Sequence, residues 1–246
     1  MASEGRNKRH PNLWPPFTQV HSAPPQQRVI AGEGALLIRD DAGPLIDAIS
    51  SWWVTLHGHG HPVLAEAIAR QAESLEQVIF ADFTHRPAER LAQRLSQISG
   101  LQRLFFSDNG STAVEVALKI AFQYHQQSGD TQRIRFGALA EAYHGDTIGS
   151  VSVGGIDLFH SIYRPMLFDA VRFPCPDRPE AQVENICLER ARELMASHGH
   201  ELAALIVEPL VQRAAGMRMH SPEFLRSLLE MARAAGVLLI VDEVAT

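Results

Sequence analysis

The chain has 246 residues, which suits one large domain or two modest ones, with ample length for a hydrophobic core. Its formal net charge of -6 argues against a nucleic-acid-binding protein, since such proteins usually carry a basic patch. Two cysteines, Cys175 and Cys187, are too few for a disulfide framework, no apolar run reaches membrane-spanning length, and the polar start does not resemble a signal peptide. We therefore expect a protein of the reducing cytoplasm with no membrane partner.

The first part of the chain predicts a loose start followed by small strands. Residues 1–12 are polar and are expected to fray. Prolines force an extended path for residues 14–19, so Trp14 and Phe17 must either dock as a hydrophobic anchor or reach a site. In residues 29–47, short apolar runs alternate with glycine and aspartate, which is typical of small antiparallel strands joined by turns.

Residues 50–62 combine adjacent tryptophans with a stretch rich in glycine and histidine. On a strand, Trp52 and Trp53 would point to opposite faces, so at least one is available to line a cavity. Three histidines alternate with glycines in residues 57–61, but no carboxylate or cysteine completes a metal-ligand set. We favour a glycine-rich loop over a metal site, and the loop leads into a helix predicted for residues 61–75.

Residues 104–121 predict a strand end, a turn and a helix in succession. Residues 104–106 are apolar, a turn-forming segment follows, and from Ser111 onward apolar residues recur at helical spacing. The first amides of such a helix have no intrahelical acceptor, and the helix dipole is positive there. An anion site suited to phosphate is therefore predicted, with Gly110 allowing close approach and Ser111 adding a hydroxyl donor. The alternative is that Ser111 only caps the helix.

The remaining elements alternate between helix and strand. We predict helices from Pro87 and at residues 183–197 and 222–234, and strands at residues 134–139, 205–208 and 237–243. The last of these strands is the most apolar and is predicted to be central. Residues 150–155 are small and predicted to be flexible, and residues 158–175 are predicted to be irregular. Glu115 is expected to pair with Lys119 on the intervening helix.

Polar groups follow three of the predicted strands. Residues 141–147 follow the first strand, Glu208 ends the second, and Asp242 and Glu243 end the third. We therefore predict an α/β fold with a largely parallel sheet, in which the phosphate site and Asp242 lie at the same edge. There Asp242 either pairs with the cationic heterocycle of a phosphate-bearing cofactor, or caps a helix or forms a salt bridge, and both interpretations stay open.

Four segments carry a resemblance to a known family. They are residues 107–115 (Ser-Asp-Asn-Gly-Ser-Thr-Ala-Val-Glu), 143–147 (Tyr-His-Gly-Asp-Thr), 206–209 (Ile-Val-Glu-Pro) and 241–246 (Val-Asp-Glu-Val-Ala-Thr). In this order and combination the chain resembles the class III aminotransferases, from about Leu13 to the last residue. The resemblance implies pyridoxal-phosphate fold type I, with a mostly parallel central sheet flanked by helices and the C-terminal part missing. It also implies that residues 1–60 contribute to a small domain and that residues 61–246 form an incomplete large cofactor-binding domain.

Three further segments narrow the resemblance. Residues 14–19, 51–53 and 212–217 are similar to the branch of the family that serves biotin biosynthesis. That branch transfers an amino group from S-adenosylmethionine to 8-amino-7-oxononanoate, giving 7,8-diaminononanoate. The identity of the amino donor stays open, and residues 212–217 are less glycine-rich than the usual family form. A homodimer is implied, since fold-type I enzymes build each site between two subunits.

The resemblance also implies roles for particular residues. The implied cofactor is pyridoxal 5'-phosphate, held by Gly110, Ser111, Tyr143, Glu208 and Asp242. In this arrangement Asp242 would pair with the pyridinium nitrogen, and Tyr143 would stack on the ring. Implied substrate contacts are Phe17, Trp52, Trp53, Tyr143 and Asp146. Many relatives carry tyrosine at the position of Phe17, so a hydroxyl that helps to recognise substrate is absent here.

The Schiff-base lysine of the family has no counterpart in the chain. Lys8 and Lys119 are the only lysines, and neither matches the family position, which lies a few dozen residues beyond Thr246. We therefore expect the sequence to be the N-terminal part of an enzyme and to be inactive by itself. Two alternatives remain. One is another class III ω-amino-acid aminotransferase or aminomutase, which would generally lack the paired tryptophans, and the other is a non-catalytic cofactor-binding module.

Overall fold

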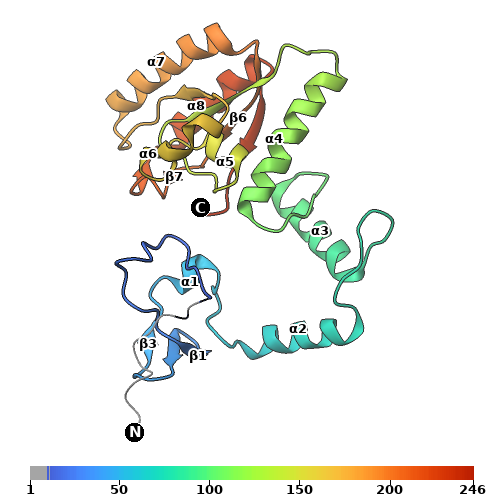
Figure 1. Cartoon of the computed structure of the whole chain (residues 1–246). Helices are drawn as coiled ribbons and strands as arrows, with labels where there is room; N and C mark the ends of the chain where they lie inside the picture. Colours follow the sequence, from blue (N-terminus) through green and yellow to red (C-terminus); the bar gives the residue numbers. More distant parts are fainter. Residues whose placement is uncertain (1–9, 11) are drawn as a thin grey trace. The chain divides into compact units, whose positions relative to one another are not determined.

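The computed structural model describes residue 10 and residues 12–246, apart from the side chain of Phe159. The chain forms two compact units, Met1–Ser99 and Gly100–Thr246, which we describe in turn (Figure 1). Lys8, and most of the residues that were expected to fray, lie outside the described part of the chain. None of the described helices is long and apolar enough to cross a membrane.

The unit Met1–Ser99 contains the small antiparallel sheet that its alternating pattern predicted. The strands run in the order β1 (Val29–Glu33), β2 (Leu36–Arg39) and β3 (Leu45–Ile46). The helices of this unit are α1 (Ser50–Trp53), α2 (Pro62–Ser74) and α3 (Arg86–Ser99). Pro62 occupies the first turn of α2, where its missing amide has no intrahelical partner to lose. The helices predicted for residues 61–75 and from Pro87 are therefore confirmed.

The two tryptophans do not lie on a strand. Residues 50–53 form one helical turn whose φ angles are 50°, 47°, 64° and 68°, which is the left-handed region. Trp52 and Trp53 therefore do not alternate across a strand. Non-glycine residues rarely adopt this backbone conformation, because Cβ crowds the following carbonyl oxygen. The surroundings of the turn must hold it in place.

The unit Gly100–Thr246 is built on a four-stranded parallel sheet. Its strands run in the order β5 (Val171–Phe173), β4 (Arg135–Leu139), β6 (Leu202–Val207) and β9 (Leu238–Val241). All three pairings are parallel, and the predicted α/β fold is confirmed. A short antiparallel hairpin, β7 (Val211–Gln212) and β8 (Arg218–Met219), follows β6.

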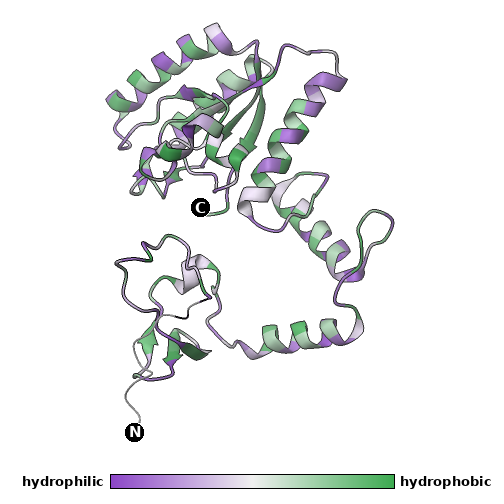
Figure 2. Cartoon of the chain, in the orientation of Figure 1, coloured by the Kyte–Doolittle hydropathy of each residue, from purple (hydrophilic) through white to green (hydrophobic). Residues whose placement is uncertain are grey.

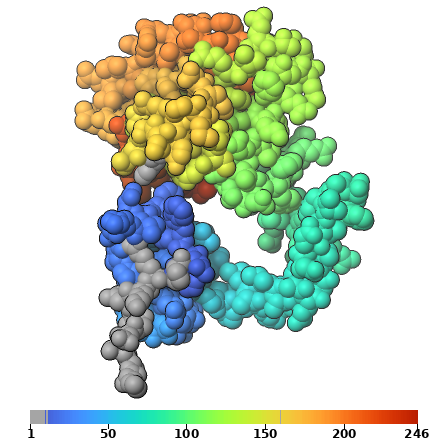
Figure 3. Space-filling view, in the orientation of Figure 1, coloured from blue at the N-terminus to red at the C-terminus, as the bar shows by residue number. Residues whose placement is uncertain are grey.

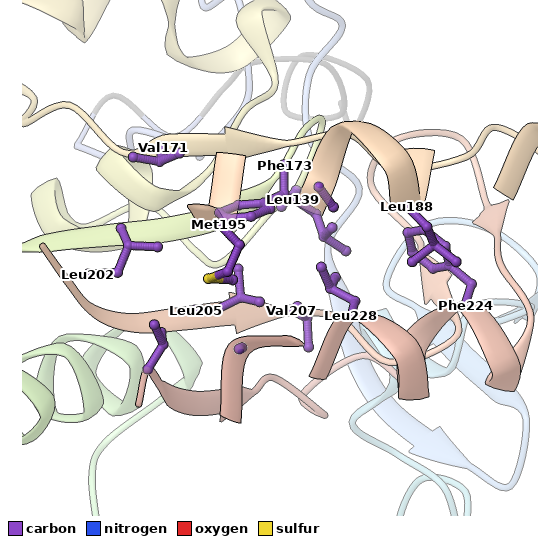
Figure 4. Packing of buried hydrophobic residues seen from close by; sticks show 14 residues of the cluster. Leu139, Val171, Phe173, Leu188, Met195, Leu202, Leu205, Val207, Phe224 and Leu228 are labelled. Carbon is purple, nitrogen blue, oxygen red and sulfur yellow. The ribbon is translucent and has the colours of Figure 1, made fainter. Parts of the chain in front are cut away.

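Helices cover both faces of this sheet. They are α4 (Gly110–Gln127), α5 (Ile148–Val153), α6 (Asp157–His160), α7 (Ala181–His198) and α8 (Pro222–Ala234), with a 3-10 helix, η1 (Ser161–Met166). One buried cluster joins the sheet to α7 and α8 through residues such as Leu205 and Phe224 (Figure 4). The other joins the sheet to α4, with Val114 and Leu118 on the helix. Because both faces are covered, every residue of β6 is buried, and the strand is coloured as hydrophobic in Figure 2.

Three local predictions fail in this unit. Residues 104–106 form no strand, and Phe105 is 70% exposed, because no strand of the described sheet pairs with them. Residues 150–155 lie mostly in α5 and are largely buried, since a capping box between Thr147 and Ser150 begins that helix. Residues 158–175, predicted to be irregular, contain η1 and β5; η1 is exposed and lies on the face of this unit seen in Figure 3.

Strand β9 is also placed differently from the prediction. It pairs only with β6 and lies at one edge of the described sheet, whereas β4 and β6 are its central strands. Its side chains are only half-buried, and Val241 is 42% exposed. Apolarity alone could not distinguish a central strand from an edge strand whose side chains are partly covered.

A substitution at Gly137 tests the packing between β4 and its neighbours. A Cβ at this position would lie 2.8 Å from Cε2 of Phe173 and 3.1 Å from Cδ1 of Leu205. We expect Gly137→Ala to lower the free energy of unfolding by about 1–3 kcal/mol, because the close-packed ring has to shift. Urea unfolding checks this value. Gly43→Ala is the matched control, since nothing lies within 4 Å of its Cβ position, and equal losses in the two variants would contradict the packing argument.

Candidate cofactor and substrate site

The N-terminus of α4 has two amides free to bind an anion. Asn109 is the N-cap: its side chain accepts a hydrogen bond from the Thr112 amide at 3.0 Å, and Thr112 completes a capping box. Ser111 is therefore not the cap, and the alternative that it serves only as a cap is wrong. Among the described residues, no acceptor faces the amides of Gly110 and Ser111. Together with the positive end of the helix dipole, they form a site for a phosphate-like anion.

The loop after β4, residues 140–147, closes onto this helix end. The Ser111 hydroxyl oxygen accepts a hydrogen bond from the Asp146 amide at 3.1 Å. Gly145 has a φ of 114°, and a Cβ there would lie 2.0 Å from the Ser111 oxygen. Only glycine meets both requirements, so Gly145 brings the loop against the helix.

Tyr143 is held at both its backbone and its phenol. Its amide donates to Oε2 of Glu208 at 3.1 Å, and its hydroxyl donates to Oδ2 of Asp146 at 2.8 Å. Burial, together with the hydrogen bond to Asp146, raises the pKa of the Tyr143 phenol above its ordinary value. The ring lies parallel to that of His160, with 6.1 Å between centroids. Tyr143 therefore presents a fixed, protonated phenol beside the helix end.

His144 is a site residue that the sequence analysis missed. Its side chain is completely buried, and its Nδ1 lies 2.7 Å from Oδ2 of Asp242. With the carboxylate as acceptor, Nδ1 carries the proton, so the bond fixes the tautomer and the orientation of both groups. The other oxygen of Asp242 accepts from the Val244 amide at 3.1 Å, and Val244 packs against Gly110. The adjacency of His144 to Tyr143 was the only available signal, and it does not identify Asp242 as the partner.

Glu208 lies at the end of β6 between these groups. Only 4% of the residue is exposed, and burial raises the pKa of its carboxyl to about 7, with the charge of Asp242 acting in the same direction. The hydrogen bond from the Tyr143 amide opposes this rise. Glu208 therefore exchanges its proton near neutral pH, unlike an ordinary exposed glutamate.

Hydrogen bonds and packing contacts thus bring six predicted site residues together in the unit Gly100–Thr246. They are Gly110, Ser111, Tyr143, Asp146, Glu208 and Asp242. They come from the start of α4 and from the segments after β4, β6 and β9, so the expected gathering at the carboxyl ends of the strands is observed. The arrangement offers anion-binding amides, a carboxylate with a fixed histidine partner, and an aromatic ring.

The other three predicted site residues lie in the unit Met1–Ser99. The rings of Phe17 and Trp52 meet edge to face, with centroids 5.7 Å apart. Phe17 is 69% exposed and Trp52 is 59% exposed, while Trp53 is 44% exposed. That Trp52 and Tyr143 both contact the substrate, as the resemblance implies, stays a prediction, since they belong to different units.

Two further side chains differ from expectation. Glu115 does not pair with Lys119; its Oε1 accepts from the Gly149 amide at 2.7 Å, which ties α4 to the start of α5. Lys119 follows Gly110 by nine residues along α4, about 13 Å of helix. Gln212 was not proposed as a site residue, yet it is fully buried and donates to the Ala140 carbonyl at 2.9 Å, where the loop after β4 begins.

Sequence comparisons relate the chain to characterised families. The model of the family Aminotransferase class-III matches residues 18–246. The chain is 50% identical over 244 residues to adenosylmethionine-8-amino-7-oxononanoate aminotransferase of Synechococcus elongatus, covering 96% of this chain and 57% of that protein. It is 47% identical over 248 residues to the protein of the same name from Nitratidesulfovibrio vulgaris, covering 95% of this chain and 46% of that protein. The chain therefore spans about half the length of these relatives.

Solved structures show the same likeness. The chain superposes on an adenosylmethionine-8-amino-7-oxononanoate aminotransferase from Methanocaldococcus jannaschii with a TM-score of 0.87 and 33% identity, covering 95% of this chain and 53% of that chain. An amine transaminase from an uncultivated Pseudomonas species, solved with pyridoxal phosphate bound, gives a TM-score of 0.87 and 30% identity, covering 96% and 56%. These likenesses confirm the predicted fold type I.

The raised pKa of Glu208 predicts a pH-dependent stability. Because the pKa rises from 4.5 to about 7, the native state retains a proton that the unfolded chain releases, so stability falls as pH rises from 4.5 toward 7. Glutamine keeps an acceptor for the Tyr143 amide but does not titrate. We expect Glu208→Gln to match the parent at pH 4.5 and to exceed it at pH 8 by up to about 3 kcal/mol in urea unfolding. The exposed Glu230→Gln is the control, and a pH-independent difference for Glu208→Gln would contradict the argument.

Proposed function

The chain belongs to the class III aminotransferase family, and we propose that the protein containing it transfers an amino group from S-adenosylmethionine to 8-amino-7-oxononanoate. The product is 7,8-diaminononanoate, an intermediate of biotin biosynthesis. The observation that carries this proposal is the 50% identity to the Synechococcus relative over 96% of this chain. The contact network around α4 supplies the chemistry that the reaction requires.

Pyridoxal 5'-phosphate is the cofactor of this family, and the residues present fit it. The amides of Gly110 and Ser111 would hold its phosphate, and a Cβ on Gly110 would lie 3.1 Å from Cγ2 of Val244, which would have to shift slightly. Asp242 accepts a hydrogen bond from the Val244 amide, and 8% of its side chain remains exposed, where the ring nitrogen would bind. An anion site and a carboxylate are thereby linked by three consecutive residues of the chain.

Each residue has a role in binding or proton handling. When bound, the cofactor supplies an electron sink for the carbon that carries the amino group. Asp242 keeps a proton on the ring nitrogen, and His144 orients Asp242 through the 2.7 Å bond. Tyr143 positions the ring by stacking, while Glu208 fixes the Tyr143 amide and supplies a polar group beside the ring.

The substrate would contact further residues of the chain. We assign the wall of the substrate pocket to Trp52 and Trp53, with Phe17 reaching it from the N-terminal segment, and we place Asp146 near the amino donor. Phe17 carries no hydroxyl, so recognition at this point relies on ring contact rather than a hydrogen bond. The exposed aromatic pair of Phe17 and Trp52 supports this assignment, because large apolar surfaces left open on a protein mark binding sites.

Assembly and location complete the proposal. The protein would be a cytoplasmic homodimer, with residues 1–60 contributing to a small domain and residues 61–246 forming part of the large cofactor-binding domain. Cys175 and Cys187 are unpaired, which suits a reducing compartment. The unpaired outer edge of β9 is consistent with further chain completing the sheet.

A second candidate is transamination of another amine. The likeness to the Pseudomonas amine transaminase favours it, because that structure superposes as well as the structure of the Methanocaldococcus enzyme does. The paired tryptophans of residues 51–53 argue for the biotin-pathway substrate. The two candidate functions differ in the carbonyl compound that receives the amino group, so substrate assays distinguish them.

The assay uses the full-length protein that contains this chain. We expect 7,8-diaminononanoate to form from 8-amino-7-oxononanoate and S-adenosylmethionine, measured by mass spectrometry. Trp52→Ala should raise the KM for 8-amino-7-oxononanoate more than it weakens cofactor binding, because the indole borders the substrate rather than the cofactor. Trp14→Ala, which removes an indole that is 87% exposed, is the control. An unchanged KM in Trp52→Ala, or turnover of a simple ketone or aldehyde in place of the oxononanoate, would contradict the assignment.

The role of Asp242 is tested by cofactor retention. We expect Asp242→Asn in the full-length protein to weaken pyridoxal phosphate binding by about 10- to 100-fold, since a charge-assisted hydrogen bond contributes about 1.5–3 kcal/mol. Equilibrium dialysis with absorbance detection measures the loss, and Glu243→Gln, which removes the adjacent exposed carboxylate, is the control.

Borohydride reduction followed by mass mapping locates the covalent attachment in the same samples. We expect an adduct at a lysine outside residues 1–246 and none at Lys119, which lies about 13 Å along α4 from the phosphate site. An adduct specifically at Lys119 would show that the placement of the cofactor at the start of α4 is wrong.

A further inference from the structure

The left-handed turn Ser50–Trp53 combines an unfavourable backbone with side chains that are not buried. Four consecutive non-glycine residues have φ between 47° and 68°, and each is disfavoured by contact between Cβ and the backbone. None of the four is buried, and Trp52 remains 59% exposed. A strained backbone that does not bury its side chains is typical of a functional site held by its surroundings.

Asp47 is the residue that holds the turn. Its Oδ2 accepts hydrogen bonds from the Ser51 hydroxyl at 2.7 Å and from Nε2 of His59 at 2.8 Å. The Asp47 side chain is only 5% exposed, and its own amide donates to the Ala35 carbonyl at 2.8 Å. Hydrogen bonds from the backbone and hydroxyl of Ser51 keep the pKa of Asp47 at about 2, so it is charged throughout the physiological range.

His59 connects this carboxylate to the small sheet. Its amide and carbonyl form two hydrogen bonds with Gly34, of 2.8 and 3.1 Å. Gly32 also lies against it, and a Cβ on Gly32 would come within 2.6 Å of the His59 Cβ. A continuous chain of contacts therefore runs from the sheet through His59 and Asp47 to Ser51, the residue before Trp52.

We propose that Asp47, braced by His59, is a positioning residue that fixes the left-handed turn and thereby sets the orientation of Trp52 against Phe17. The indole is presented to solvent by a hydrogen-bonded polar network rather than by an apolar core. The consequence of this positioning for catalysis rests on the proposed function, in which Trp52 borders the substrate. Asp47 itself touches neither substrate nor cofactor in this scheme.

Two substitutions separate positioning from simple stability. Asp47→Asn keeps the shape of the side chain but removes its charge. Ser51→Gly removes the hydroxyl donor while relieving the backbone, because glycine accepts a φ of 47° without strain. Ser51→Gly should therefore fold at least as well as the parent. Ser74→Ala is the matched control, since it deletes a serine hydroxyl that bonds the Gln71 carbonyl in α2 of the same unit.

The orientation of Trp52 is measured independently of activity. The full-length protein is labelled with 5-fluorotryptophan, and the Trp52 resonance is assigned by its loss in Trp52→Phe. We expect Trp52 to give one sharp resonance at the same position in the parent and in Ser74→Ala. In Asp47→Asn and Ser51→Gly, we expect the Trp52 resonance to be shifted or broadened. An unchanged Trp52 resonance in Ser51→Gly would overturn the proposal, even if Asp47→Asn fails to fold.

Kinetics then test the consequence for the substrate. In Ser51→Gly we expect the KM for 8-amino-7-oxononanoate to rise about tenfold, with kcat and the cofactor absorbance retained, since one hydrogen bond to a charged group is lost. A purely structural role would not separate KM from kcat in a variant whose stability is intact. If the parent does not turn over this substrate, the proposed function fails, whereas the fluorine spectrum still decides the role of Asp47. A shifted resonance with an unchanged KM would overturn the link to substrate binding.

Discussion

The hydrogen bond between His144 and Asp242 joins two chain segments on which the site depends. It connects the loop after β4 to the segment after β9, across the end of the intervening strand β6. Both segments also contact the start of α4. The Asp146 amide donates a hydrogen bond to the Ser111 hydroxyl, and Val244 packs against Gly110. Each of these segments follows a strand of a parallel sheet, so a single sheet edge brings together groups that are far apart in sequence.

Electrostatics give this sheet edge its chemical character. Glu208 and Asp242 lie near each other in a buried region, and burial raises the pKa of Glu208 to about 7. A protonated Glu208 reduces the repulsion between the two carboxyl groups, and the positive end of α4 favours negative charge nearby. In the unit Met1–Ser99, the charged carboxylate of Asp47 holds an unfavourable backbone turn instead. The aromatic pair of Phe17 and Trp52 remains exposed beside this turn.

Most elements of the fold could be predicted from the sequence because their periodicity is local. The helix at residues 222–234 has a serine cap, proline in its first turn and apolar residues at helical spacing, and the structure has α8 at the same residues. The same reasoning failed where the outcome depended on contacts with other parts of the chain. Residues 104–106 have the apolarity of a strand but no neighbour in the described sheet. Residues 150–155 are small and were predicted to be flexible, but most of them belong to the buried helix α5.

The sequence by itself determined the family, because four short motifs occur in order, and the resemblance that they carry implied the cofactor and the six residues that gather at the sheet edge. Tertiary structure alone decided the partners of those residues. His144 becomes part of the site only because a residue 98 positions away meets its Nδ1, and Glu115 turns to Gly149 rather than to Lys119. It also decided the left-handed conformation of Trp52, since hydrogen bonds from Ser51 and His59 converge on Asp47 and outweigh the local preference of the backbone.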